Sequence, residues 1–302
     1  MPETDDKLFD MVRRFLEYIK LERGYSPNTV TSYGDDLEGF EKFFTELEGG
    51  VTWQTVDSDV VRMWMEKLME SGYTASSVNR KLSALRSFYK FALKRNLLSK
   101  DPVHMLTGPK KHKPLPVYVK EKDMDALLDD AMWTDGYEDV LERTIITTFY
   151  ETGIRLAELI GIDDSDVRLE QRELRVLGKR NKERVIPFGE SLEETFNTYI
   201  QARDSEVTRT DSAFFSNTKG RRVSRGQVMT MVRRQLSRVT TQKKRSPHVL
   251  RHTFATAMLN NDANIESLKK LLGHESVATT AKYAHTTFEQ LKRVYKNAHP
   301  RA

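Results

Sequence analysis

The sequence predicts a mainly α-helical protein with one small antiparallel β-sheet, divided into two domains. Three observations lead to this prediction. Apolar residues recur at helical spacing through much of the 302-residue chain. Three short runs between 167 and 187 are typical of β-strands. The segment 108–117, Gly-Pro-Lys-Lys-His-Lys-Pro-Leu-Pro-Val, holds three prolines and three lysines, which is typical of an extended linker between domains.

The N-terminal domain, 1–107, is predicted to contain four to five helices. Apolar residues from Leu8 to Ile19 follow the helical period. Ser26-Pro27 predicts the start of a second helix, because a hydroxyl can cap it and proline suits its first position. A third helix is expected over about 57–69, and a fourth from 74 or 76 until the Asp101-Pro102 step.

The C-terminal domain, 118–302, is predicted to be mostly helical around the small sheet. Strands are expected at 167–170, 173–177 and 183–187, with 178–182 as the turn between the last two. Helices are expected after the sheet at about 190–203, 224–239, 247–260, 264–272, 277–284 and 286–297.

The charge distribution points to a polyanionic partner more clearly than the total charge does. The net charge of +5 is modest. Seven basic residues and no acidic one lie in 80–100, and six basic residues and no acidic one lie in 233–245. Such clusters favour a phosphate-binding surface. The candidate DNA-binding residues are Arg80, Lys81, Arg86, Lys90, Arg233, Arg234, Lys243, Lys244 and Arg245.

The composition excludes several other classes of protein. The chain contains no cysteine, which excludes disulfides, thiolate metal sites and a cysteine nucleophile. We expect a cytoplasmic, soluble protein, because the first residues lack the features of a signal peptide and no apolar run approaches the ~20 residues of a membrane span. Neither a nucleotide-binding glycine loop nor a carboxylate cluster occurs, so we expect no cofactor and no metal.

A short C-terminal stretch carries the residues that suggest chemistry. His248, Arg251, His274 and Tyr283 lie within 36 residues. At pH 7 only about one tyrosine in a thousand is ionised, so a nucleophilic tyrosine needs a base or a strong positive potential nearby. The two histidines and the arginine would supply both. This combination suits a phosphodiester transesterification that uses a tyrosine and no metal.

Two upstream motifs complete the candidate site. Arg155 and Glu158 are one helical turn apart, and Lys179 lies at the tip of the predicted hairpin. Each residue alone also fits an ordinary structural role: a helical Arg–Glu pair, an exposed turn lysine, a capping histidine or a core tyrosine. Three nearby cations could take the role of Lys179 instead, namely Arg180, Lys182 and Arg184.

Taken together, these motifs resemble the tyrosine recombinases of the phage-integrase family, and most of all the bacterial Xer recombinases. The resemblance covers essentially the whole chain. It rests on SPNT, NRKLSALRSFY, TGIRLAEL, GKRNKERVIP, SPHVLRHTFAT, LLGH and the terminal HPRA, with six positions in the family's order and spacing. One departure is Arg180, which stands where a glycine is common in the family.

The resemblance implies a role for each residue of the site. Tyr283 would attack the scissile phosphate and form a 3′-phosphotyrosyl bond, and Arg155 and Arg251 would hold its non-bridging oxygens. His274 would donate a hydrogen bond to the phosphate. Lys179 would protonate the leaving 5′-oxygen. His248 would help move the proton of Tyr283, with Glu158 supporting the site.

The resemblance also implies an architecture and partners. A SAM-like core-binding domain and a catalytic domain would form a C-shaped clamp on double-stranded DNA. Helix 286–297 would dock on a neighbouring protomer in a homo- or hetero-tetramer, which a paralogous recombinase could share and a DNA translocase could activate. Resolution of chromosome dimers is the expected role; a phage or mobile-element integrase, a type IB topoisomerase and a non-catalytic DNA-binding protein are the alternatives.

Overall fold

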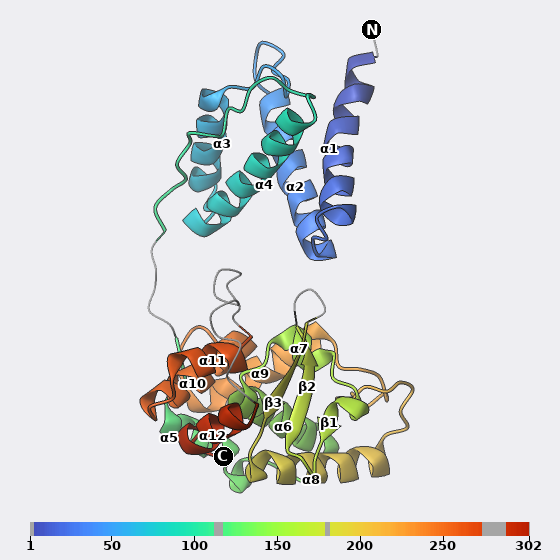
Figure 1. The fold of residues 1–302 in the computed structure, drawn as a ribbon, viewed down its shortest axis with the longest axis vertical. Coiled ribbons are helices and arrows are strands. Elements are labelled where there is room, and N and C mark those ends of the chain that lie inside the picture. Colours follow the sequence, from blue (N-terminus) through green and yellow to red (C-terminus); the bar gives the residue numbers. More distant parts are fainter. Residues whose placement is uncertain (1–2, 112–116, 179–181, 274–287, 302) are drawn as a thin grey trace. The chain divides into compact units, whose positions relative to one another are not determined.

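A computed structural model of the chain describes residues 3–111, 117–178, 182–273 and 288–301 (Figure 1). The chain forms two units, residues 1–114 and 115–302. The boundary between them falls inside 108–117, the segment that its prolines and lysines predict to be a linker. Among the described helices, none is both long and apolar enough to cross a membrane.

The N-terminal unit is a group of four helices in its described part. They begin where the sequence provides caps: the Ser26 hydroxyl accepts a hydrogen bond from the Thr29 amide at 3.3 Å, and Thr74 caps the fourth helix in the same way. The helices are α1 Glu3–Leu21, α2 Pro27–Thr45, α3 Ser58–Glu70 and α4 Ala75–Lys94. The four helices predicted from periodicity are present, but α4 ends at Lys94 and not at the expected Asp101-Pro102 step, because Asn96 has a left-handed backbone (φ 54°) that does not continue a helix.

Aromatic side chains fill the core of this unit. The rings of Phe40, Phe44 and Phe88 surround Trp53, at centroid distances of 5.6, 5.1 and 4.6 Å. The indole N–H of Trp53 donates to the Glu41 carboxylate at 2.8 Å, so its one polar atom is satisfied. Each ring in such a core buries a large apolar area, which lets a short helical unit form a core of its own.

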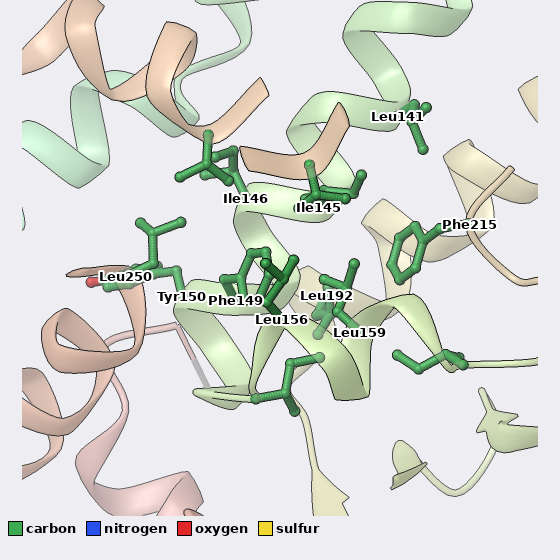
Figure 2. Packing of buried hydrophobic residues seen from close by; sticks show 14 of the residues in the cluster. Leu141, Ile145, Ile146, Phe149, Tyr150, Leu156, Leu159, Leu192, Phe215 and Leu250 are labelled. Carbon is green, nitrogen blue, oxygen red and sulfur yellow. The ribbon is translucent and has the colours of Figure 1, made fainter. Parts of the chain in front are cut away.

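Helix α6, Tyr137–Thr152, is the central helix of the C-terminal unit, which carries the predicted catalytic residues and is hereafter the catalytic unit. Twelve of its 16 residues are buried, and Figure 2 shows Ile145, Ile146, Phe149 and Tyr150 packed among side chains from other elements. Helical periodicity does not delimit α6 in the sequence, because a helix buried on every side has no polar stripe. Its buried threonines donate hydroxyl hydrogen bonds to carbonyls one turn earlier, as Thr148 does to Thr144 at 2.7 Å.

The small sheet has the predicted antiparallel order β1-β2-β3. Its strands are β1 Val167–Arg168, β2 Glu173–Leu177 and β3 Glu183–Pro187. β1 is shorter than the expected 167–170, because the chain turns at Arg172, which has a left-handed backbone (φ 52°). β2 and β3 pair from Glu173↔Pro187 to Leu177↔Glu183, which confirms the predicted hairpin.

The helices after the sheet agree with the predicted ranges to within three residues where they are described. The prediction includes no range for the short helices before the sheet. Ser224 and Gln227 form a reciprocal capping box at the start of α9, and Pro247 occupies the first position of α10. The expected helix 277–284 lies outside the described residues. The bounds are α5 Glu121–Leu128, η1 Asp130–Met132, α7 Leu156–Ile160, η2 Asp164–Asp166, α8 Glu190–Glu206, α9 Arg225–Val239, α10 Pro247–Asn260, α11 Ile265–Leu271 and α12 Phe288–Ala298.

Candidate active site

The first turn of α10 carries His248, and the next turn carries Arg251. His248 is exposed, whereas Arg251 is buried, with only 8% of its surface accessible. The Arg251 guanidinium donates from Nη1 to the Gly153 carbonyl and from Nη2 to the Leu272 carbonyl, both at 2.6 Å. Two backbone carbonyls from distant parts of the chain therefore fix this side chain.

The short helix α7 places Arg155 and Glu158 beside Arg251. The Arg155 amide donates to Glu158 Oε2 at 2.7 Å, and its Nη1 donates to Oε1 at 2.8 Å. Its Nη2 donates to the Gly273 carbonyl at 3.0 Å. The predicted Arg–Glu pair is thus present. It is more than a local helical pair, because Arg155 also binds the Gly273 carbonyl, directly before His274.

A third arginine, Arg184 of β3, completes the group. Its guanidinium binds both oxygens of Glu158, at 2.6 and 2.9 Å, and its Nε donates to the Leu271 carbonyl at 3.1 Å. From the sequence alone, Arg184 is only an alternative to Lys179 as the cation of the hairpin. Its position at the seventh residue of GKRNKER is the one signal that could have singled it out.

Three consecutive carbonyls at the end of α11 therefore each accept from a different arginine. Leu271 pairs with Arg184, Leu272 with Arg251 and Gly273 with Arg155. The last carbonyls of a helix lack partners within it and carry partial negative charge, so cations are favoured there. Within the described ranges, no cluster of three or more histidine, aspartate or glutamate residues could hold a metal ion.

Gly153 brings these elements together. It ends α6 with a left-handed backbone (φ 60°), and a Cβ there would lie 2.3 Å from Phe254 Cδ1 and 2.9 Å from Leu272 Cδ2. A glycine is therefore required both by the backbone and by the close approach of α10 and the end of α11. Its carbonyl is one of the two that hold Arg251.

The electrostatics of the group follow from its three guanidiniums and one carboxylate. Burial and the neighbouring Arg155 charge lower the pKa of Arg251 to about 10, so Arg251 remains charged at neutral pH. Burial would raise the pKa of Glu158, but the hydrogen bonds and charges of Arg184 and Arg155 outweigh it and hold that pKa below the usual range. Glu158 is therefore ionised.

The same surroundings keep His248 neutral. Partial burial, and then the positive charge of Arg251, lower the pKa of the His248 imidazole below its ordinary value of 6.5. At pH 7 the ring is thus able to accept a proton rather than already carrying one.

The structure brings four of the predicted site residues together: Arg155, Glu158, His248 and Arg251. Lys179, His274 and Tyr283 lie outside the described residues, as does Arg180. The structure does describe Gly178, which precedes Lys179, and Gly273, which precedes His274. A Cβ on Gly178 would be 3.7 Å from both Glu158 Oε1 and Arg184 Nη1, and one on Gly273 would be 3.2 Å from Arg184 Nη1. The chain therefore enters both segments beside the arginine group.

The candidate DNA-binding residues of α4 differ in their surroundings. Arg80 and Lys81 both pair with Asp36, which is 1% exposed, and Lys81 lies 2.9 Å from it. Only 12% of the Lys81 side chain is exposed, so in the isolated unit it mainly neutralises a buried carboxylate. Arg86 and Lys90 are both exposed, and Arg86 also donates to the Leu106 carbonyl.

The candidates of the catalytic unit also fall into two groups. Arg234 pairs with the buried Glu142 of α6, and Arg245 is partly buried. Arg233, Lys243 and Lys244 are exposed. Contact of any of these residues with DNA remains a prediction.

Helix α12 packs against its own catalytic unit. Tyr295 and Ala298 are buried against a cluster that includes Phe254, Met258 and Leu271. Tyr295 stacks on His299 with a centroid distance of 5.2 Å. The structure contains one chain, so the expected docking of segment 286–297 on a neighbouring protomer remains a prediction.

Comparison with known proteins supports the resemblance seen in the motifs. Residues 118–290 match the phage integrase family, and residues 12–96 match the N-terminal SAM-like domain of phage integrases. The chain is 33% identical to tyrosine recombinase XerC of Chlorobaculum tepidum, covering 95% of this chain and 94% of that protein. It is 33% identical to tyrosine recombinase XerD of Staphylococcus haemolyticus, covering 97% and 99%.

Solved structures share the fold. The integrase of transposon Tn1549 in complex with transposon right end DNA superposes with a TM-score of 0.72 at 18% identity, covering 95% of this chain and 98% of that one. The XerH recombinase bound to difH substrate, in a pre-cleavage complex, gives 0.67 at 17% identity, covering 94% and 93%.

The chain belongs to the phage integrase family of tyrosine recombinases. It is an enzyme of DNA cleavage and rejoining, and its relatives make Xer-like site-specific tyrosine recombination its activity.

Proposed function

We propose that this recombinase cleaves DNA by attack of Tyr283 on a scissile phosphate that Arg155 and Arg251 hold. The observation that carries the proposal is the attachment of both guanidiniums to adjacent carbonyls, Gly273 and Leu272, at the end of α11. Among the described residues, the side chain of each arginine donates two hydrogen bonds, and a guanidinium has five N–H groups, so each is suited to bind phosphate oxygens as well.

The chemistry follows from this arrangement. In the transition state, the phosphorus has five ligands and its oxygens carry extra negative charge. Guanidiniums already fixed in position stabilise that charge without reorganisation, and loss of one such donor costs about a hundred- to a thousandfold in rate. The phosphate becomes linked to Tyr283 as a 3′-phosphotyrosine, and the 5′-oxygen leaves. The covalent bond conserves the phosphodiester energy, so rejoining needs no ATP.

The other residues would move protons and position the phosphate. His248, neutral at pH 7, is suited to accept the Tyr283 proton. Lys179 would protonate the leaving 5′-oxygen, and His274 would donate a hydrogen bond to the phosphate. Glu158 holds Arg155 in position, as its two hydrogen bonds to that residue suggest.

We further infer the biological setting from the relatives. Their names and full-length coverage favour a Xer-like role in resolving chromosome dimers, with a tetramer of identical or paralogous recombinases on two DNA sites. Exposed basic residues of both units, such as Lys90 and Lys243, are suited to contact DNA phosphates. The similarity to a transposon integrase keeps a mobile-element integrase as the second candidate.

The test is covalent capture of DNA by the full chain. The substrate is a nicked duplex that carries the site the chain selects from a pool of random sequences. The wild-type chain should form a protein–DNA adduct that survives denaturation, and Tyr283→Phe should form none, because it lacks the attacking oxygen.

Tyr118→Phe is the matched control. Tyr118 is an exposed tyrosine of the same unit, so its variant should form the adduct at the wild-type rate. An adduct in Tyr283→Phe, or a wild-type chain that binds the site and never forms one, would exclude the proposed mechanism.

A further inference from the structure

Arg184 is held more completely than the two arginines that are proposed to bind the phosphate. It binds both oxygens of Glu158 and the Leu271 carbonyl, and only 15% of its side chain is exposed. The three hydrogen bonds come from Nε, Nη1 and Nη2, so they fix the plane of the guanidinium. A residue bound in this way is poorly placed to leave its partners for a substrate.

Two glycines lie against this guanidinium. Gly273 has a left-handed backbone (φ 63°), and a Cβ there would approach Nη1, Cζ and Nε of Arg184 to 3.2–3.3 Å. Gly178 continues the β2–β3 hairpin, because its amide donates to the Lys182 carbonyl at 2.8 Å. A Cβ on Gly178 would lie 3.7 Å from Arg184 Nη1.

The contacts of Arg184 coincide with the points where three site segments begin. Gly178 directly precedes Lys179, Gly273 directly precedes His274, and Glu158 holds Arg155. Resting on the function proposed above, we propose that Arg184 is a positioning residue for recombination. It fixes the hairpin and the end of α11 on Glu158, and so sets the places from which Lys179 and His274 reach the phosphate.

Sharing of Glu158 gives Arg184 a second effect. Oε1 accepts from both Arg155 and Arg184, and Oε2 accepts from the Arg155 amide and Arg184. Without Arg184, the whole charge of this buried carboxylate would act on Arg155, in competition with the phosphate. A lysine would keep the positive charge but not the planar fork that binds both oxygens and Leu271 together.

The experiment compares two versions of the nicked substrate, with oxygen or sulfur at the 5′-bridging position. Sulfur leaves without a proton, so the ratio of the sulfur to the oxygen cleavage rate reports how well the acid works. A displacement of about 1 Å costs on the order of a hundredfold, and we expect Arg184→Lys to lose about that much on the oxygen substrate. Its rate ratio should rise about tenfold above that of the wild type.

Arg175→Lys is the matched control, because Arg175 lies in the same sheet and binds the Asp166 carboxylate from Nε and Nη2, each at 2.8 Å. It should change neither rate. If Arg184 acts through Lys179, adding Arg184→Lys to Lys179→Ala should slow cleavage by less than the product of the two single losses.

A wild-type rate ratio in Arg184→Lys would overturn the positioning role, as would a loss that follows melting temperature and DNA affinity alone. Should that variant not fold, Glu158→Gln weakens the same contacts from the other side, and its rate ratio should rise in the same way. Failure of the proposed function would differ, because the wild-type chain itself would then form no adduct or Tyr283→Phe would form one.

Discussion

The guanidiniums of Arg155 and Arg251 are positioned before any substrate binds. Each is attached to a carbonyl at the end of α11, and Glu158 further restrains Arg155. A mobile arginine would lose side-chain entropy when it bound the phosphate, whereas a fixed one has lost it already. In the proposed mechanism, this preorganisation lets two side chains stabilise charge for which other enzymes use a metal ion.

The proton on the leaving oxygen gives a prediction for a single residue. Lys179→Ala should lose oxygen-substrate cleavage by about two to four orders of magnitude, as is typical of losing a general acid. The 5′-bridging sulfur substrate should restore most of the rate. Lys182→Ala serves as the comparison from the same hairpin, because Lys182 directly precedes β3, and this variant should need no rescue. Rescue of Lys182→Ala instead would assign the acid to Lys182.

The sequence identifies the residues that are proposed to act on the phosphate and its attacking tyrosine better than the residues that hold them. Arg155, His248 and Arg251 lie in short motifs, and the structure brings them together. Arg184 lies in the motif GKRNKERVIP, but nothing local indicates what it holds, because its Leu271 partner is 87 residues away and its Glu158 partner 26. Spacing along the chain reports which residues share a helix face, and a contact between distant segments leaves no trace in it.

At the scale of elements, Gly153 links the end of α6 to α10 and α11. Gly153→Ala would force a left-handed alanine and a clash with Phe254, so it should destabilise the catalytic unit by about 1–3 kcal/mol or more. Cleavage should fall as well, because the displaced Gly153 carbonyl holds Arg251. Urea unfolding and adduct formation measure the two effects.

Gly39→Ala is the control for this substitution. Gly39 lies within α2, and nothing occupies the 4 Å around the position of an added Cβ. Alanine favours a helix over glycine by about 1 kcal/mol, so this variant should be as stable as the wild type or slightly more stable. Equal stability of the two alanine variants would mean that the packing at Gly153 is not restrictive.

Elements with a clear start signal are the ones that the sequence delimits well. Helices α9 and α10 begin at Ser224 and Pro247 signals and end within a residue of the prediction. Helix α6 forms the centre of the unit and yet has no clear periodic stripe, since all of its residues from Thr144 to Thr152 are buried. The burial that makes a central helix important therefore also removes the pattern by which a sequence reveals it.

At the scale of the whole chain, α12 attaches the C-terminal segment to the catalytic unit over two buried ionisable groups. Glu151, at the end of α6, lies 3.5 Å from the Tyr295 hydroxyl, with Ser191 and Arg301 also facing it. His299 lies 3.2 Å from the Tyr150 carbonyl, among the rings of Tyr150, Phe254 and Tyr295 and near Arg301.

These two groups respond to pH in opposite directions. Burial raises the pKa of Glu151 from 4.5 to about 8, so the stability of the folded chain falls as pH rises between these values. Burial lowers the pKa of His299 from 6.5 to about 4, so stability falls as pH drops through that range. Between pH 4.5 and 6.5 the two effects offset each other.

Above pH 6.5, therefore, only Glu151 of this pair still acts, and we predict that stability declines towards pH 8 by up to about 1.4 kcal/mol per pH unit. Glu151→Gln should remove this decline and unfold at a higher urea concentration at pH 8, since the amide carries no charge to bury. Urea unfolding midpoints of the full chain at several pH values measure this decline. Glu170→Gln is the control, because Glu170 is exposed. A decline that persists unchanged in Glu151→Gln would place the buried titration elsewhere.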